Sequence, residues 1–303
     1  MAALAPGFFK GKHLVVFGAG YVGGAVAAAV GGGLGARVTA LTRNPAKVSA
    51  LAAEGCDVVI DDLSSDAWHK KISGPVDFVL NCVSSGGDGI DGYRRSYVEG
   101  MRSILAWAAT QGSIGTLIYT SSTSVYPQSG GARVDENASI EGAVGTSAVL
   151  LEAENLLREN ARAVFARWFI LRLAGIYGPR RHHLLDQLRN GETEIGGRGA
   201  HRLNLIHRDD IVAAIIAAFA APSGIANEIF NVADDTAVPK SEVVTWLAER
   251  IGQPAPRFTG EATAGRRAVT PDRVITNDKI KAVLGWRPRY PDFRAGYRPL
   301  LEA

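Results

Sequence analysis

The chain has 303 residues, 47% of them apolar, and a formal net charge of +3 with charges of both signs spread along it. A chain of this length can bury one large core, or one core with a smaller lobe attached. The nearly balanced charge argues against a nucleic-acid groove or an anionic membrane surface, so we expect a small-molecule partner.

Cysteine content and hydropathy indicate the compartment. Cys56 and Cys82 lie in apolar runs without metal-ligand or redox spacing, which predicts buried free thiols in a reducing environment and no metal site. No stretch approaches the roughly 18 uninterrupted apolar residues of a membrane span, and the N-terminus lacks a signal-peptide pattern. We therefore expect a cytoplasmic protein with neither a membrane nor a nucleic-acid partner.

From His13 onward, short apolar runs rich in β-formers alternate with longer helical patterns. This alternation predicts βα units around a parallel sheet that is buried on both faces. The predicted strands and the two clearest early helices are, in chain order, Leu14–Phe17, Arg37–Leu41, Asp57–Ile60, Val76–Leu80, the helix Tyr93–Gln111, Thr116–Tyr119, the helix Val149–Asn160, and Trp168–Leu171. The prediction is an α/β fold with a doubly wound parallel sheet of the Rossmann type.

The pattern loosens after Gly178-Pro179 into a basic, glycine-rich stretch, residues 180–202. A helix over Ile211–Ala221 follows, with Asp209 and Asp210 expected to cap it, and then a further strand over Glu228–Val232. The chain thus leaves the sheet, returns to it and leaves again.

This course predicts two units. Residues 1–175 and 204–232 are expected to form the dinucleotide-binding domain, and residues 176–203 and 233–303 a smaller, discontinuous C-terminal substrate lobe.

The assignment of a dinucleotide rests on Gly18-Ala19-Gly20-Tyr21-Val22-Gly23, which follows the first strand and opens an Ala/Val-rich helix. Gly18 permits the tight turn, Gly20 lets a pyrophosphate approach the backbone, and Gly23 lets helix and strand pack closely. Tyr21 and Val22 begin the helix whose N-terminus meets the pyrophosphate. The alternative is a glycine-rich turn that binds no ligand.

The end of the second strand, Leu41-Thr42-Arg43-Asn44, bears on the choice of dinucleotide. An NAD site usually carries a carboxylate here for the ribose 2′-hydroxyl, and this segment has none. Arg43, with Lys47 about one helical turn further on, suits a 2′-phosphate instead. We predict NADP rather than NAD, held in part by Thr42 and Arg43. The alternative is that Arg43 is a solvated loop residue.

With these segments in view, the chain resembles the extended short-chain dehydrogenase/reductase family, the NAD(P)-dependent epimerase/dehydratases, over nearly its whole length. The resemblance rests on the glycine loop and on further motifs in the same order: Asp62-Leu63, Tyr119-Thr120-Ser121-Ser122-Thr123-Ser124-Val125-Tyr126, Leu171-Arg172-Leu173-Ala174-Gly175-Ile176-Tyr177-Gly178-Pro179, Ile206-His207-Arg208-Asp209-Asp210, and Leu284-Gly285-Trp286-Arg287-Pro288.

The resemblance implies site residues beyond the glycine loop. Asp62, followed by Leu63, would face the adenine, and Val83 and Ser84 would line the cofactor cleft. Ser122 matches the family's catalytic Ser/Thr position; the alternative is a hydroxyl that only satisfies backbone groups at a strand end.

The chain departs from the family where the family's chemistry is concentrated. The family's Tyr and the Lys four residues later correspond to Val144 and Ala148, or to Thr146 and Leu150 if the alignment slides by two. The family's Asn corresponds to Tyr97. A general acid or base must then come from elsewhere, and the candidates by position are Tyr97, Tyr126, Tyr177, His182, His183 and His207.

Several of these candidates have a structural alternative. For Tyr126 and Tyr177 the alternative is a packing role, and for His207 it is a hydrogen-bonded structural role. Ser122 and Tyr97 are therefore the predicted catalytic residues.

The leading hypothesis is an atypical NADP-dependent oxidoreductase or epimerase/dehydratase-like enzyme that acts on a polar small molecule such as a sugar derivative. An anionic substrate is one alternative for the basic side chains Arg180, Arg181, Arg189, Arg198, His201 and Arg202; a solvated face is the other. The second hypothesis is a catalytically silent NADP(H)-binding protein that reports redox state to a partner. The resemblance also implies a homodimer formed through the helices Tyr93–Gln111 and Val149–Asn160; the alternative is that the sheet alone buries the apolar faces of both helices.

Overall fold

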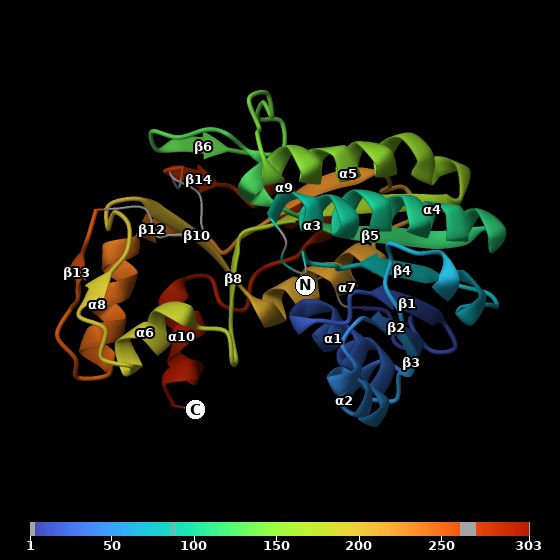
Figure 1. Ribbon diagram of the computed structural model, residues 1–303, viewed down its shortest axis with the longest axis horizontal. Helices are drawn as coiled ribbons and strands as arrows, with labels where there is room; N and C mark the ends of the chain where they lie inside the picture. Colours follow the sequence, from blue (N-terminus) through green and yellow to red (C-terminus); the bar gives the residue numbers. More distant parts are fainter. Residues whose placement is uncertain (1–3, 86, 88, 261–270, 303) are drawn as a thin grey trace.

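A computed structural model describes residues 4–85, 87, 89–260 and 271–302 (Figure 1). Its centre is a seven-stranded parallel sheet with the strand order β11-β7-β5-β4-β1-β2-β3. The strands are β1 (His13–Phe17), β2 (Arg37–Thr42), β3 (Asp57–Ile60), β4 (Phe78–Asn81), β5 (Ile114–Ser122), β7 (Phe165–Leu173) and β11 (Glu228–Val232). The strand order reverses between β1 and β4, which defines a doubly wound sheet and confirms the predicted fold class.

Both faces of this sheet are buried. Leu14 and Val16 belong to one hydrophobic cluster, while Val15 and Phe17 belong to the other, because successive strand residues point to opposite faces. Figure 1 shows the helices in two layers, one on each side of the sheet. The first layer contains α1 (Tyr21–Ala28), α2 (Val48–Ala53) and α7 (Arg208–Phe219), and the second α3 (Gly89–Tyr93), α4 (Gly100–Thr110) and α5 (Thr146–Asn160).

All three predicted helices differ in part from the observed ones, and the helix expected over Val149–Asn160 begins at Thr146. The helix expected over Tyr93–Gln111 consists of α3, a π-helical turn over Arg94–Glu99, and α4. The helix expected from Ile211 begins at Arg208, so the prediction that Asp209 and Asp210 cap it is wrong. His207 is the N-cap, and its Nδ1 accepts a hydrogen bond from the Asp209 backbone N–H at 3.2 Å.

Asp210 lies in the first turn of α7 and does not cap it. Its two carboxylate oxygens accept hydrogen bonds from the backbone N–H groups of Arg289 and Tyr290 at 2.6 and 3.0 Å. A carboxylate on the first turn of the helix therefore holds the C-terminal segment in place.

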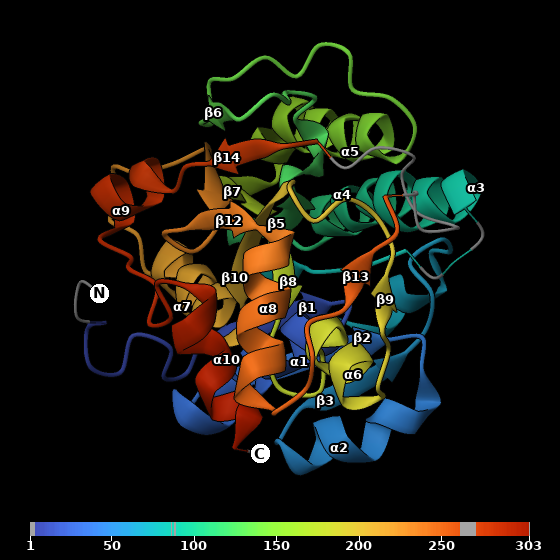
Figure 2. The same cartoon turned by 90° about the vertical axis from the view of Figure 1, so that its left-hand side faces the viewer.

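A smaller lobe lies at one end of the sheet, and Figure 2 looks onto it. Its apolar cluster includes Leu185, Val243 and Tyr297, which come from distant parts of the sequence. The remaining elements, in the lobe and around it, are β6 (Ala132–Val134), β8 (Gly175–Tyr177), α6 (His183–Arg189), β9 (Glu194–Ile195), β10 (Arg202–His207), β12 (Ala237–Pro239), α8 (Lys240–Arg250), β13 (Arg257–Phe258), β14 (Arg273–Ile275), α9 (Asp278–Leu284) and α10 (Phe293–Leu301). None of the helices in the described ranges is long and apolar enough to cross a membrane.

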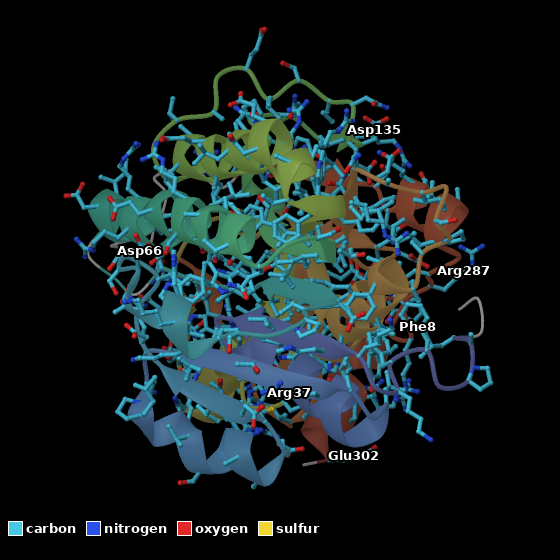
Figure 3. The ribbon with its side chains drawn as sticks, turned by 90° about the vertical axis from the view of Figure 1, so that its right-hand side faces the viewer. Phe8, Arg37, Asp66, Asp135, Arg287 and Glu302 are labelled. Carbon is cyan, nitrogen blue, oxygen red and sulfur yellow. The ribbon has the colours of Figure 1, made fainter. Side chains whose placement is uncertain are left out.

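Figure 3 views the opposite end of the molecule, where Arg37 lies. Arg37 is the first residue of β2, and its Nε is 2.8 Å from a carboxylate oxygen of Asp57, the first residue of β3. This end therefore carries the amino ends of the strands. The smaller lobe lies at the carboxyl ends, where open α/β sheets bind their ligands.

One carboxyl group is buried where the chain passes from β11 into the smaller lobe. Asp234 is 3% exposed; one of its oxygens accepts a hydrogen bond from the Thr236 backbone N–H at 3.1 Å and the other has no partner among the described residues. Burial raises the pKa of Asp234 to about 8, and the charges of Asp235, Asp292 and Asp210 add to the effect. The folded protein therefore keeps Asp234 protonated at neutral pH.

This burial makes stability depend on pH. Because the unfolded carboxyl has a pKa near 4, folding takes up a proton and the free energy of unfolding falls as pH rises from about 4 to about 8. Asp234→Asn removes the ionisation, so at pH 8 to 9 we expect it to stabilise the protein by about 1–3 kcal/mol. Urea unfolding at several pH values measures this, with the exposed Asp278→Asn as the matched control. The same pH slope in wild type and Asp234→Asn would contradict the assignment.

Candidate dinucleotide site

A cavity of about 700 Å³ opens at the carboxyl ends of the strands, beside the point where the strand order reverses. A volume of this size lies within the range of ligand and cofactor sites. The predicted cofactor residues that line it are Gly18, Gly20, Tyr21, Val22, Thr42, Arg43, Asp62, Leu63, Val83 and Ser84, and both predicted catalytic residues, Tyr97 and Ser122, line it as well. Gly23 lies beneath the loop and not in the wall of the cavity.

The three loop glycines are required for different reasons. Gly18 has a φ of +83°, and a Cβ there would lie 2.6 Å from the Val83 backbone nitrogen. A Cβ on Gly23 would lie 2.4 Å from the Gly18 carbonyl oxygen. At Gly20 the nearest atom would be 3.8 Å away, so packing alone does not demand a glycine. Its missing side chain leaves space at the N-terminus of α1 that suits a pyrophosphate.

At one end of the cavity, Arg43 meets a carboxylate from the neighbouring strand. Its Nη1 lies 3.4 Å from Asp62 Oδ2, and the other Asp62 oxygen accepts a hydrogen bond from the Ser64 backbone N–H at 2.8 Å. Burial works to raise the pKa of Asp62, but the hydrogen bonds from Ser64 and the charge of Arg43 outweigh it and lower the pKa. A carboxylate from the residue two places after β3 thus lies at this end of the cavity, next to Arg43.

At the inner end, Ser122 ends β5. Its Oγ accepts a hydrogen bond from the Ser124 backbone N–H at 3.1 Å and so caps the short helical turn Thr123–Val125. This bond to a backbone N–H is the kind that the structural alternative for Ser122 predicts. The same bond occupies an acceptor site of the hydroxyl and leaves its proton available to a molecule in the cavity.

Tyr97 enters the cavity from the π-helical turn, a distortion that is frequent at functional sites. Its ring centroid lies 5.2 Å from that of Tyr93, which lines the same wall. Burial raises the pKa of Tyr97 to about 12, and a hydrogen bond with the Ser85 backbone only partly offsets this. The phenol therefore keeps its proton at neutral pH and acts as a hydrogen-bond donor.

The other acid/base candidates lie outside the cavity wall. Tyr126 is 1% exposed, donates a hydrogen bond to Asn231 and accepts one from Arg172. The Tyr177 ring stacks on that of Tyr297 with centroids 4.7 Å apart. His207 caps α7, as described above, and neither His182 nor His183 is among the lining residues.

The positions that correspond to the family's Tyr-Lys pair also lie elsewhere. Val144 is 78% exposed and Ala148 faces outward on α5, while Leu150 belongs to the core. Neither alignment therefore brings a phenol or an ammonium from α5 to the cavity.

The basic stretch does not form a single anion site. Of its cationic side chains, Arg181 alone is among the described residues that line the cavity. Arg202 donates two bonds to Asp272, at 2.8 and 3.1 Å, and Arg189 donates to the Leu300 carbonyl. These contacts hold the smaller lobe together.

Several lining residues were not predicted from the sequence. Tyr93 and Ser96 come from the same helical region as Tyr97. Tyr93 lies four residues before Tyr97, a spacing that could have suggested it.

Cys82 follows β4 as a free thiol whose pKa is raised by burial to about 11, so it is unreactive at neutral pH. Cys56 is free and buried as predicted, whereas Cys82 is free but only partly buried, so the prediction of a buried thiol is wrong for Cys82 because it lies at the cavity wall. No group of three or more His, Cys, Asp or Glu in the described ranges could hold a metal ion.

The glycine loop, its place at the strand reversal and the succession of motifs agree with a family match over residues 14–233, to the NAD dependent epimerase/dehydratase family. The chain belongs to this family. Its members' dependence on a nicotinamide dinucleotide matches the cavity's open space at Gly20.

Two curated proteins are similar over part of their length. The chain is 30% identical over 179 residues to protein YeeZ of Escherichia coli K12, covering 59% of this chain and 60% of YeeZ. It is 28% identical over 167 residues to a 3-diazoavenalumate denitrifying reductase of a Streptomyces species, covering 51% of this chain and 53% of the reductase. The chain thus matches less than two thirds of the length of these relatives.

Solved structures are similar over nearly the whole chain. A protein of unknown function from Silicibacter pomeroyi is 28% identical, with a TM-score of 0.75 and coverage of 96% of this chain and 97% of that one. A dTDP-glucose 4,6-dehydratase variant from Streptomyces venezuelae, solved with NAD, is 22% identical, with a TM-score of 0.82 and 96% of both chains covered. At 22% identity, the similarity to the dehydratase shows a shared fold.

Substitutions at two of the loop glycines should affect different properties, stability at Gly18 and dinucleotide affinity at Gly20. Gly18→Ala places a Cβ against backbone that cannot move aside and in a disfavoured φ, so we expect it to destabilise the protein by about 2–4 kcal/mol. Gly20→Ala should change stability by less than about 1 kcal/mol yet weaken dinucleotide binding at least tenfold, since its methyl group occupies the pyrophosphate space. Urea unfolding and calorimetric titration measure the two effects. Equal destabilisation by both substitutions would contradict this division.

Proposed function

We propose that this protein is an NADP-dependent reductase of a polar, electrophilic small molecule, with Tyr97 and Ser122 as hydrogen-bond donors to the atom that is reduced. The observation that supports this proposal most strongly is the scarcity of proton acceptors in the cavity wall. Among the described residues that line the cavity there is no histidine, and the one carboxylate, Asp62, lies beside Arg43 with a lowered pKa. The cavity therefore offers hydrogen-bond donors and lacks a base that is poised near neutral pH.

A cavity with hydrogen-bond donors but no base poised near neutral pH favours reduction over epimerisation or dehydration. Those reactions begin by oxidising a substrate alcohol, which requires a group to remove the hydroxyl proton. Tyr97, with a pKa of about 12, and Cys82, with a pKa of about 11, are both protonated at neutral pH. Reduction has the opposite need, because the acceptor atom gains negative charge that a donor stabilises.

The proposed reaction divides the work between cofactor and protein. When bound, the reduced nicotinamide supplies a hydride with its electron pair. Tyr97 and Ser122 hold the acceptor atom and donate hydrogen bonds to it. Tyr97 then gives its proton to an acceptor that has become basic and regains a proton from water. The relative named as a reductase supports this direction of reaction.

The preference for NADP rests on Arg43 and its surroundings. Arg43 is exposed at the mouth of the cavity, and its guanidinium reaches Asp62 at 3.4 Å, a long and weak contact. A 2′-phosphate would offer the same guanidinium a doubly charged partner in bidentate geometry. Asn44, next in sequence, also lines this end of the cavity and can donate a hydrogen bond.

Arg43→Ala tests the choice of cofactor. We expect the Kd for NADP to rise about 10- to 100-fold, because a charge-assisted bidentate contact is lost, while the Kd for NAD stays within about twofold. Isothermal titration measures both, and Arg37→Ala, an exposed arginine at the far end of β2, is the control. Equal losses for both dinucleotides would overturn the NADP assignment, and a wild-type protein that binds neither would overturn the proposed function.

Tyr97→Phe and Ser122→Ala test the chemistry. Each should lower kcat for NADPH oxidation by about 10- to 100-fold with little change in the Kd for NADPH, because a donor to the reduced atom is lost. The acceptors to screen are aldehydes, quinones, imines and aryl diazonium ions. Tyr93→Phe, which keeps the neighbouring ring, is the matched control. Tight NADPH binding without oxidation by any acceptor would exclude the reductase and favour a silent redox sensor.

A further inference from the structure

A strained turn borders the cavity just after β8. Gly178 and Arg181 exchange two backbone hydrogen bonds of 3.0 and 3.1 Å, which closes a tight turn with Pro179 and Arg180 at its corners. Arg180 has a φ of +62°, the left-handed conformation that a type II turn requires at this corner and that glycine normally supplies. Strain of this kind in a non-glycine residue is concentrated at functional sites and ligand clamps.

Tyr21 joins this turn to the dinucleotide loop. Its hydroxyl donates a hydrogen bond to the Pro179 carbonyl at 3.0 Å. The approach is close enough that a Cβ on Gly178 would lie 2.8 Å from the Tyr21 hydroxyl oxygen. The turn is therefore held against the first residue of α1, immediately after Gly20.

Two arginines lie against the Tyr21 ring, and they differ in what else they contact. The Arg208 guanidinium lies 5.3 Å from the ring centroid and also donates to the Asp209 carboxylate at 2.9 and 3.0 Å. The Arg181 guanidinium lies 5.4 Å from the same centroid, lines the cavity and has no carboxylate partner in the described part of the chain. Arg181 thus makes a cation–π contact with Tyr21 beside the cavity.

A second cation approaches Gly20 from the connection between β2 and α2. The Lys47 ammonium lies 3.9 Å from the position that a Cβ on Gly20 would take, and Lys47 lines the cavity. It likewise has no carboxylate partner among the described residues. Lys47 and the N-terminus of α1 therefore border the open space at Gly20, and Arg181, which lies on the ring of the next residue, lines the same cavity.

We propose that Arg181 and Lys47 clamp the pyrophosphate of the bound dinucleotide, and that the strained Pro179-Arg180 turn positions Arg181 for this contact. The inference rests on the proposed function because it deepens the same site. Two cations without carboxylate partners match the two negative charges of a pyrophosphate, and a guanidinium forms paired hydrogen bonds with phosphate oxygens. The roles of the cations then differ, since Arg43 reads the 2′-phosphate while Arg181 and Lys47 hold the part that NAD and NADP share.

Binding of ADP-ribose, NAD and NADP by isothermal titration tests the clamp, because all three ligands carry the pyrophosphate and ADP-ribose lacks the nicotinamide. Arg181→Gln and Lys47→Gln should each weaken all three by about tenfold. Arg43→Ala should weaken NADP alone. Arg198→Gln is the matched control for Arg181, since it removes an exposed charge of the same basic stretch that does not line the cavity; its affinities should stay within about twofold of wild type.

The outcomes separate the clamp from its alternatives. If Arg181→Gln binds all three ligands as wild type does, or only raises the KM of a reducible substrate, the clamp is overturned and Arg181 belongs to the substrate. A loss confined to NADP in Lys47→Gln would overturn the role given to Lys47. Protein that shows the clamp pattern with ADP-ribose but oxidises no NADPH would exclude the reductase and leave the clamp standing.

Discussion

The contact between the Gly18 turn and the backbone after β4 is the constraint on which the site depends. A side chain at Gly18 would overlap the Val83 nitrogen and the Cys82 carbonyl, at 2.6 and 2.7 Å from its Cβ. The contact draws the start of α1 onto the reversal in strand order, so the amide groups of that helix and the ends of the flanking strands face one cavity. All other features of the site are arranged around this junction.

The end of β5 is held by a buried polar network just below the cavity. Glu154 on α5 accepts hydrogen bonds from Ser121 at 2.6 Å and from Arg172 at 2.6 and 3.1 Å, and the pair is almost completely buried. Arg172 also donates to Tyr126, whose hydroxyl bonds to Asn231 on β11. Because removing one partner would strand a buried charge, the network ties β5, β7, β11 and α5 into one rigid support for Ser122.

The proposed cofactor contacts and the proposed proton donors lie in separate parts of this fold. The glycine loop, Arg43, Lys47 and Arg181 concentrate hydrogen-bond donors and positive charge on the side of the cavity where we propose that the phosphates bind. The inner wall holds neutral hydroxyl groups, and burial keeps the Tyr97 proton in place. The proposed proton donors can therefore differ while the proposed cofactor contacts are kept, because those contacts come from loops at the strand ends.

The sequence by itself determined the fold class, the dinucleotide loop and the approximate position of each strand in the main sheet. These follow from local signals: apolar runs of strand length, glycines at fixed spacing, and helical periodicity between them. The π-helical turn and the N-cap of α7 were not determined in this way. His207 replaces the expected aspartate caps because Asp210 is drawn into long-range bonds with Arg289 and Tyr290. Tertiary structure alone placed Asp62 beside Arg43 and Arg181 on Tyr21, since pairs that lie 19 and 160 residues apart meet only when the sheet and the smaller lobe are assembled.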